Sequence, residues 1–180
     1  DGSSPPEPLL DEGQPADSSR VVASFRSNPT TGLDLWVRKG NQPLQPFLRT
    51  EASEAAPTVS PDERWIAYVS DESGQYEIYV RPYPVREGKW PVSTDGGEEP
   101  IWSRDGKEIF YRNGQKWMAA SVRLKPEFSA DKPKLLFEGP YVNVAGKSYA
   151  VTKNGQRFLV LEPVEKEIEP VSYLNIVFNW

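Results

Sequence analysis

The stretch SPDERWIAYVSDESGQYEIYVRPYP, residues 60–84, is the most informative part of this chain. A polar turn around Asp62 leads into the apolar segment 65–69, and a second turn leads into the segment 75–81. The first part of the stretch recurs as SRDGKEIFYRN (103–113), as TKNGQRFLVLE (152–162) and, most weakly, as ADSSRVVASF (16–25). A polar turn that returns at nearly constant spacing, each time before an apolar strand, indicates a repeat architecture.

The segments around these copies repeat as well. A second strand follows each copy: GLDLWVR (32–38), QYEIYVR (75–81), QKWMAASV (115–122) and YLNIVFN (173–179). A third series is PFLRT (46–50), WPVST (90–94) and KLLFE (134–138), and EPLL (7–10) fits it. Lead-in strands are PTVS (57–60), PIWS (100–103) and SYAVT (148–152). Four short strands roughly every 40 to 50 residues are typical of a β-propeller blade.

The sequence therefore predicts an all-β fold, a β-propeller arc of about four four-stranded blades. The predicted blades lie approximately at 14–50, 56–95, 99–139 and 146–180, and residues 1–13 are the end of a preceding blade or a tail. A β-sandwich would give similar strand spacing, but it would not repeat the same turn at the same phase. An open arc leaves two blade faces uncovered, at a cost of roughly 5–10 kcal/mol for each face of several hundred Å². We therefore expect this 180-residue piece either to be marginally stable on its own or to self-associate through the open blade ends.

The turn residues are interpreted as structural: Asp62, Asp105, Gly106, Asn154 and Gly155. Asp and Asn side chains accept hydrogen bonds from backbone N–H groups two residues on, and Gly supplies a positive φ without steric cost. A catalytic acid would not tolerate exchange of Asp for Asn between copies, whereas a turn residue does. Glu63 stands where Gly is favoured, so that turn is either strained or of a different type. The recurring residues Trp36, Trp65, Trp102 and Trp117 are expected to pack between blades rather than to bind a ligand.

Composition limits the chemistry of this chain. Its 180 residues contain neither Cys nor His, so they cannot build a Ser–His–Asp triad, a thiolate nucleophile or a Cys- or His-ligated zinc site. We expect no catalytic residues, no cofactor and no metal. The net charge of −5 argues against a nucleic-acid partner, which favours a clustered basic face. No apolar run approaches the roughly 18 residues needed to span a bilayer, so we expect no membrane insertion by this segment.

Four stretches resemble the WD40-like, TolB-like β-propeller repeats of bacteria: SPDERWIAYVSDESGQYEIYVRPYP, STDGGEEPIWSRDGKEIFYRNG, FSADKPKLLFEGPY and LNIVFNW. They are most similar to the C-terminal propellers of bacterial eukaryotic-type serine/threonine kinases. The resemblance covers roughly residues 30–180 and is specific in 58–141. It implies a closed ring of six or more blades in the family, and it favours an extracytoplasmic location, periplasmic or at the cell surface, over a cytoplasmic one.

The expected function is a non-catalytic propeller module for interaction with a protein, peptide or small ligand near the propeller axis. Such a module would be the sensor or scaffold part of a larger bacterial protein such as a serine/threonine kinase. The alternative is the substrate-gating propeller of a prolyl-oligopeptidase-type peptidase. A sialidase-like glycosidase is less favoured because an Asp box needs Gly two places after Asp, whereas Gly106 directly follows Asp105.

Overall fold

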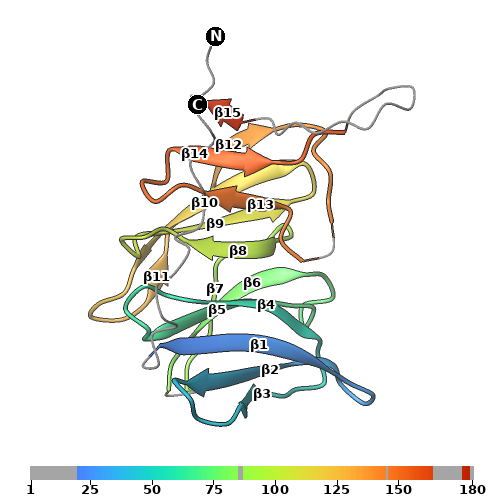
Figure 1. The fold of residues 1–180 in the computed structure, drawn as a ribbon, viewed down its shortest axis with the longest axis vertical. Helices are drawn as coiled ribbons and strands as arrows, with labels where there is room; N and C mark the ends of the chain where they lie inside the picture. Colours follow the sequence, from blue (N-terminus) through green and yellow to red (C-terminus); the bar gives the residue numbers. More distant parts are fainter. Residues whose placement is uncertain (1–19, 85–86, 145, 164–175, 179–180) are drawn as a thin grey trace.

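The computed structural model describes residues 20–84, 87–144, 146–163 and 176–178. All regular structure in these ranges is β, arranged in four separate antiparallel sheets that stack in chain order (Figure 1). The chain is therefore all-β and forms a partial β-propeller, as the sequence predicted. None of the described residues belongs to a helix long and apolar enough to cross a membrane.

Each sheet is one blade. Blade 1 contains β1 (Val21–Asn28), β2 (Gly32–Lys39) and β3 (Gln45–Leu48). Blade 2 contains β4 (Glu54–Val59), β5 (Trp65–Ser70), β6 (Glu77–Pro82) and β7 (Trp90–Pro91). Blade 3 contains β8 (Glu98–Trp102), β9 (Glu108–Asn113), β10 (Lys116–Arg123), β11 (Ser129–Ala130) and β12 (Lys134–Glu138). Blade 4 contains β13 (Tyr149–Val151), β14 (Arg157–Val160) and β15 (Ile176–Phe178).

The blades differ from the predicted units in detail. Blade 2 begins at Glu54 rather than at residue 56, and blade 3 begins at Glu98 rather than at residue 99. The outer strand of blade 3 is divided, because β11 and β12 both pair with β10, at opposite ends of that strand. Pro133 lies directly before β12 and has no N–H to donate to a ladder, which explains the interruption. The predicted unit at 1–13 and the copy of the turn near Asp17 lie outside the described residues.

Successive residues of a strand face opposite sides of its sheet, so alternate side chains contact the two neighbouring blades. From blade 2, Ile66 and Tyr68 pack against Leu35 and Val37 of blade 1. The other face of blade 2 packs against blade 3 through a cluster that includes Val69, Ile78, Val80, Ile109 and Tyr111. Blades 3 and 4 meet through Phe110, Trp117, Phe158 and Val160. Three interfaces of the same kind therefore form the core.

The tryptophans expected to pack between blades lie in different environments. Trp102 is buried in the core between blades 2 and 3, and Trp117 is buried in the core between blades 3 and 4. Trp65 is partly buried and contacts the rings of Trp90 and Phe128, at centroid distances of 5.7 and 5.3 Å. Trp36 is also only partly buried, and the guanidinium of Arg26 lies 4.9 Å from its ring centroid.

Candidate functional site

The turn that precedes β5 is held by a small hydrogen-bond network. Asp62 Oδ1 accepts hydrogen bonds from Ser60 Oγ at 2.6 Å and from the backbone N–H of Arg64 at 3.2 Å. Ser60 Oγ in turn accepts a hydrogen bond from the backbone N–H of Trp65 at 3.0 Å. The Asp62 carboxylate is thus used to close the turn that connects the first and second strands of blade 2.

The same network recurs in blade 3. Asp105 Oδ1 accepts from Ser103 Oγ at 2.8 Å and from the N–H of Lys107 at 3.1 Å, while Ser103 Oγ accepts from the N–H of Glu108 at 2.9 Å. The hydrogen bonds from Ser103 and from the Lys107 backbone outweigh burial and lower the pKa of Asp105 below 3.8.

In blade 4 an amide performs the same role. Asn154 Oδ1 accepts from Thr152 Oγ1 at 2.8 Å and from the N–H of Gln156 at 3.1 Å, and Thr152 Oγ1 accepts from the N–H of Arg157 at 3.1 Å. Because a neutral amide oxygen makes the bonds that a carboxylate makes in the other two turns, the network requires an acceptor at this position rather than a negative charge.

The residue after the Asp or Asn has a positive φ in all three turns. The angles are 57° at Glu63, 72° at Gly106 and 73° at Gly155. The turn of blade 2 is therefore the same type as the other two and is strained, which decides between the two possibilities that the sequence left open. A side chain in this left-handed region costs about 1–2 kcal/mol, because its Cβ approaches the following carbonyl oxygen.

Two adjoining hollows lie between blades 2 and 3 on the end of the blades that carries these turns. The larger has a volume of about 690 Å³ and is lined by Asp62, Asp105, Gly106, Lys107, Glu108, Ser121, Val122, Arg123, Leu124, Lys125 and Asp131. The smaller has a volume of about 430 Å³ and is lined by Asp62, Arg64, Trp65, Pro82, Tyr83, Leu124, Lys125 and Pro126. We call the two together the turn-face groove. The structure thus brings together Asp62, Asp105 and Gly106 at one site, whereas Asn154 and Gly155 lie in the turn of blade 4.

The turn-face groove is lined by aromatic side chains and by charged side chains of both signs. In the smaller hollow Trp65 and Tyr83 are partly buried, so each offers part of an aromatic surface to a ligand. In the larger hollow Arg123 is occupied by an ion pair with Asp131, at 3.0 Å between Nη2 and Oδ1. Arg64 and Lys125 are exposed, and unlike Arg123 they have no ion-pair partner among the described residues.

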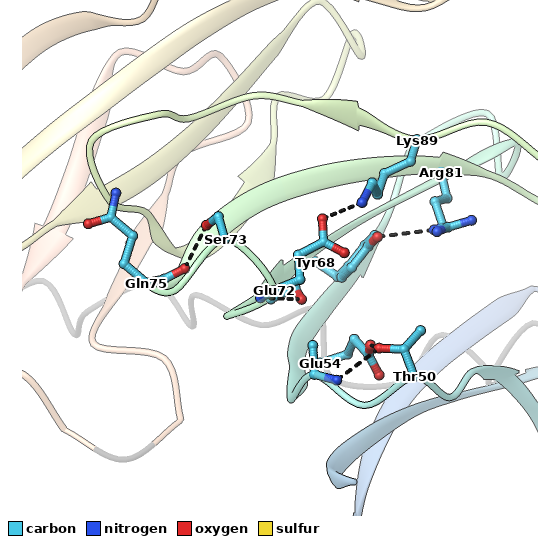
Figure 2. Close-up of polar contacts among 10 residues, drawn as sticks. Thr50, Glu54, Tyr68, Glu72, Ser73, Gln75, Arg81 and Lys89 are labelled. Atoms are coloured by element: carbon cyan, nitrogen blue, oxygen red, sulfur yellow. Dashed lines mark hydrogen bonds and ion pairs between the residues drawn. The ribbon is translucent and has the colours of Figure 1, made fainter.

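A second polar region extends along blade 2 from Arg81, which pairs with Ile66 near the start of β5, to the opposite end of blades 1 and 2. Figure 2 shows Tyr68 beside Arg81, whose Nε donates a hydrogen bond to the phenol oxygen at 3.1 Å. It also shows Glu72 joined to Lys89 by an ion pair. A wide, open depression of about 580 Å³ near these groups is lined by Thr50, Glu51, Ala52, Asp71 and Glu72.

Two buried carboxyl groups near this region have opposite pKa shifts. Burial raises the pKa of Glu54 above 4.5, although the hydroxyl of Thr50 donates to its Oε1 (Figure 2). Its Oε2 has no hydrogen-bond partner among the described residues. Burial also acts to raise the pKa of Asp34, but hydrogen bonds from Thr31, Asn28 and Arg49 together outweigh it and lower that pKa. Asp34 is therefore held as an anion, whereas Glu54 is biased toward its neutral form.

Tyr68 is unsuited to proton transfer near neutral pH. Burial raises its pKa to about 12, and the hydrogen bond from Arg81 only partly opposes this effect. The phenol therefore remains neutral and acts as a buried hydrogen-bonding group between blades 1 and 2.

A buried network joins the first strands of blades 3 and 4. Glu99 accepts hydrogen bonds from Ser148 through both carboxylate oxygens, at 2.7 Å from the backbone N–H and 2.6 Å from Oγ. Arg112 Nη1 donates to the same Ser148 Oγ at 3.1 Å, and the Tyr149 hydroxyl donates to the carbonyl of Glu99 at 2.8 Å. The polar groups of Glu99, Arg112, Ser148 and Tyr149 therefore bond to one another across two blades.

The sequence interpretation missed these buried acids. One signal was present in the strands already aligned: Asp34 and Glu77 occupy the same place in GLDLWVR and QYEIYVR. Asp34 accepts from Arg49 Nε at 3.1 Å, and Glu77 accepts from Ser93 Oγ at the matching place in the next blade. No local signal marked Glu99, whose partner lies 49 residues away. Among the described residues no group of three or more acids could hold a metal ion.

Comparison with known proteins identifies the fold. The structure is similar to TolB from Acinetobacter baumannii, with a TM-score of 0.60 and 20% sequence identity over 81% of this chain and 37% of that one. It is also similar to a putative TolB from Agrobacterium tumefaciens, with a TM-score of 0.53 and 14% identity over 66% of this chain and 45% of that one. The chain thus spans less than half the length of either protein. No family model and no curated protein matches the sequence. The fold is a TolB-like β-propeller.

Proposed function

We propose that this chain is a non-catalytic propeller module that binds an extended acidic segment of a partner protein in the turn-face groove. The observation that carries the proposal is the juxtaposition of partly buried Trp65 and Tyr83 with two exposed cations, Arg64 and Lys125, that have no ion-pair partner among the described residues. Aromatic side chains offer large contact area at low entropic cost, and Arg pairs well with carboxylates. An acidic peptide uses both features.

In the turn-face groove a partner would lie away from the propeller axis. The groove is lined by the turns between first and second strands, by the last residues of the third strands β6 and β10, and by the residues that follow them. The innermost strands, by contrast, are β4, β8 and β13 at the edges of their sheets. A ligand near the axis, which the sequence interpretation favoured, stays a prediction.

Within a larger protein, we propose that the module is a sensor or scaffold region, with a bacterial serine/threonine kinase as the favoured context. The support is the resemblance of the repeats to kinase-associated propellers, together with the TolB-like fold. The same resemblance favours a position outside the cytoplasmic membrane. The complete reading frame tests this part: a kinase catalytic domain supports it, whereas a hydrolase domain favours the peptidase alternative.

Binding is tested with three fluorescently labelled peptides of equal length that are acidic, neutral and basic. We expect the acidic peptide to bind tightest and its affinity to fall with ionic strength. The double substitution Arg64→Ala and Lys125→Ala should weaken that binding by about tenfold or more, since hydrogen bonds to charged groups contribute roughly 1.5–3 kcal/mol. Lys153→Ala is the matched control, because Lys153 is an exposed lysine in the equivalent turn of blade 4. Equal affinity for the three peptides, or no effect of the double substitution, contradicts the proposal.

A further inference from the structure

The smaller hollow of the turn-face groove is lined mainly by aromatic, aliphatic and proline side chains. Trp65, Pro82, Tyr83 and Leu124 are partly buried there, and Pro126 is exposed. These five are the majority of the eight residues that line the hollow. A ligand in this hollow therefore meets ring surfaces more often than hydrogen-bonding side chains.

Packing against the core holds both aromatic side chains in place. The ring of Trp65 lies 5.7 Å from that of Trp90 and 5.3 Å from that of Phe128, between centroids. The ring of Tyr83 lies 6.1 Å from that of Phe47, in the core between blades 1 and 2. Side chains that are already ordered lose little conformational entropy when a ligand binds, so this aromatic surface is pre-organised.

The backbone of the hollow offers few free N–H donors. Pro82 and Pro126 have no N–H group, and the N–H groups of Arg64, Trp65 and Tyr83 donate to acceptors within blade 2. Five of the eight lining residues therefore cannot donate a main-chain hydrogen bond to a ligand. Recognition by strand addition depends on such bonds, so this hollow is poorly suited to a partner that adds a β-strand.

We infer that the partner segment binds this hollow in the polyproline II conformation, with proline rings against Trp65 and Tyr83 and carboxylates near Arg64 and Lys125. It is the same acidic segment as in the proposed function, on which this inference rests. A polyproline II segment makes no ladder of main-chain hydrogen bonds, and proline orders it before binding, which suits an aromatic-lined groove. Because this helix has three residues per turn, prolines at every third place share one face and leave the places between them for acids.

Two fluorescently labelled peptides of equal length and equal charge test the inference on the wild-type chain. In one peptide Pro stands at every third place between glutamates, and in the other Ala replaces each Pro. We expect the proline peptide to bind at least about fivefold tighter, because it buries more apolar surface and loses less entropy. Equal affinities, or tighter binding of the alanine peptide as strand addition predicts, overturn the inference but leave the proposed acidic partner intact. Absence of binding by both peptides overturns the two proposals together.

Substitution of Tyr83 tests the ring contact itself. Tyr83→Leu keeps an apolar side chain against Phe47 but removes the flat ring, so it should weaken binding of the proline peptide by about fivefold and that of the alanine peptide by less than about twofold. Tyr76→Leu is the matched control, because Tyr76 is 45% exposed and lies outside the turn-face groove. Far-UV circular dichroism confirms that both variants retain the fold. Equal weakening of the two peptides by Tyr83→Leu, or the same effect of Tyr76→Leu, overturns the inference.

Discussion

Replacement of Glu63 by glycine should stabilise this protein, although glycine destabilises most ordered positions. Glu63 has a φ of 57°, and its equivalents in blades 3 and 4 are Gly106 and Gly155. Removing the side chain relieves about 1–2 kcal/mol of left-handed backbone strain. Glycine in turn increases the conformational entropy of the unfolded chain, which costs about 0.4–1 kcal/mol.

Loss of an ion pair reduces the gain further. Glu63 Oε1 lies 3.8 Å from Nε of Arg20, whose side chain is 69% exposed, and exposed pairs of this kind contribute roughly 0.2–1 kcal/mol. At the midpoints of these ranges, the expected net effect of Glu63→Gly is a stabilisation of about 0.2 kcal/mol. Glu63→Ala removes the same ion pair but keeps the strain. We therefore expect Glu63→Gly to be more stable than Glu63→Ala by about 1 kcal/mol, the reverse of the usual order.

Equilibrium unfolding in urea, followed by tryptophan fluorescence at low protein concentration, measures these differences. Gly106→Ala is the matched control in blade 3. A Cβ at Gly106 would meet no atom closer than 3.6 Å, so its expected cost of about 1 kcal/mol is conformational rather than steric. If Glu63→Ala were as stable as Glu63→Gly or more so, the assignment of backbone strain at this position would be refuted.

The remaining predictions concern the turn and the buried polar groups. Asp62→Asn should change the free energy of unfolding little, because Asn154 makes the same bonds in the turn of blade 4. Asp62→Leu should cost about 1 kcal/mol, measured by urea denaturation. Equal costs for the two variants would contradict the turn assignment. Ser148→Ala should cost about 2 kcal/mol by the same assay, because it removes one hydrogen bond from each of two buried charged groups, and a neutral result would contradict that network. Because the pKa of Glu54 is raised above 4.5 in the folded state, its contribution to stability is fully present below that pH and is lost as pH rises through the folded pKa. Thermal melting of the wild type and Glu54→Gln should therefore show an advantage of the variant that grows as pH rises above 4.5, and a constant difference would contradict the burial argument.

Much of the fold was predictable because its determinants are local. The turn network joins groups two to five residues apart, such as Ser60, Asp62 and Trp65, so their spacing is visible in the sequence. The same spacing recurs at Ser103 and Thr152, and together with period-2 apolar strands it indicated four propeller blades. The predicted strand KLLFE (134–138) is β12, whereas the two-residue strand β11 was not predicted, because only its pairing with Val122 and Arg123 of β10 defines it.

The candidate site was less predictable, because its parts come from separate blades. Asp62 was correctly placed in a turn, but nothing in its neighbourhood showed that Lys125 would lie beside it in the same groove. Glu99 and Ser148 gave no local signal for the same reason, although their bonds are among the shorter ones between blades. Groups distant in sequence come together only when the blades stack.

The amino-acid sequence was thus sufficient to show that this chain forms repeated antiparallel blades, that Asp62, Asp105 and Asn154 close their turns, and that it lacks the residues for His- or Cys-based chemistry. Which positions are covered became clear only from the stacking of the blades. Ile66 and Val22 occupy the same place in the repeat, because they pair with Arg81 and Arg38 of the next strand, yet Ile66 is fully buried and Val22 is 42% exposed. The physical reason is that a turn's hydrogen bonds lie within one short segment, whereas burial of a blade face depends on whether another blade stacks against it.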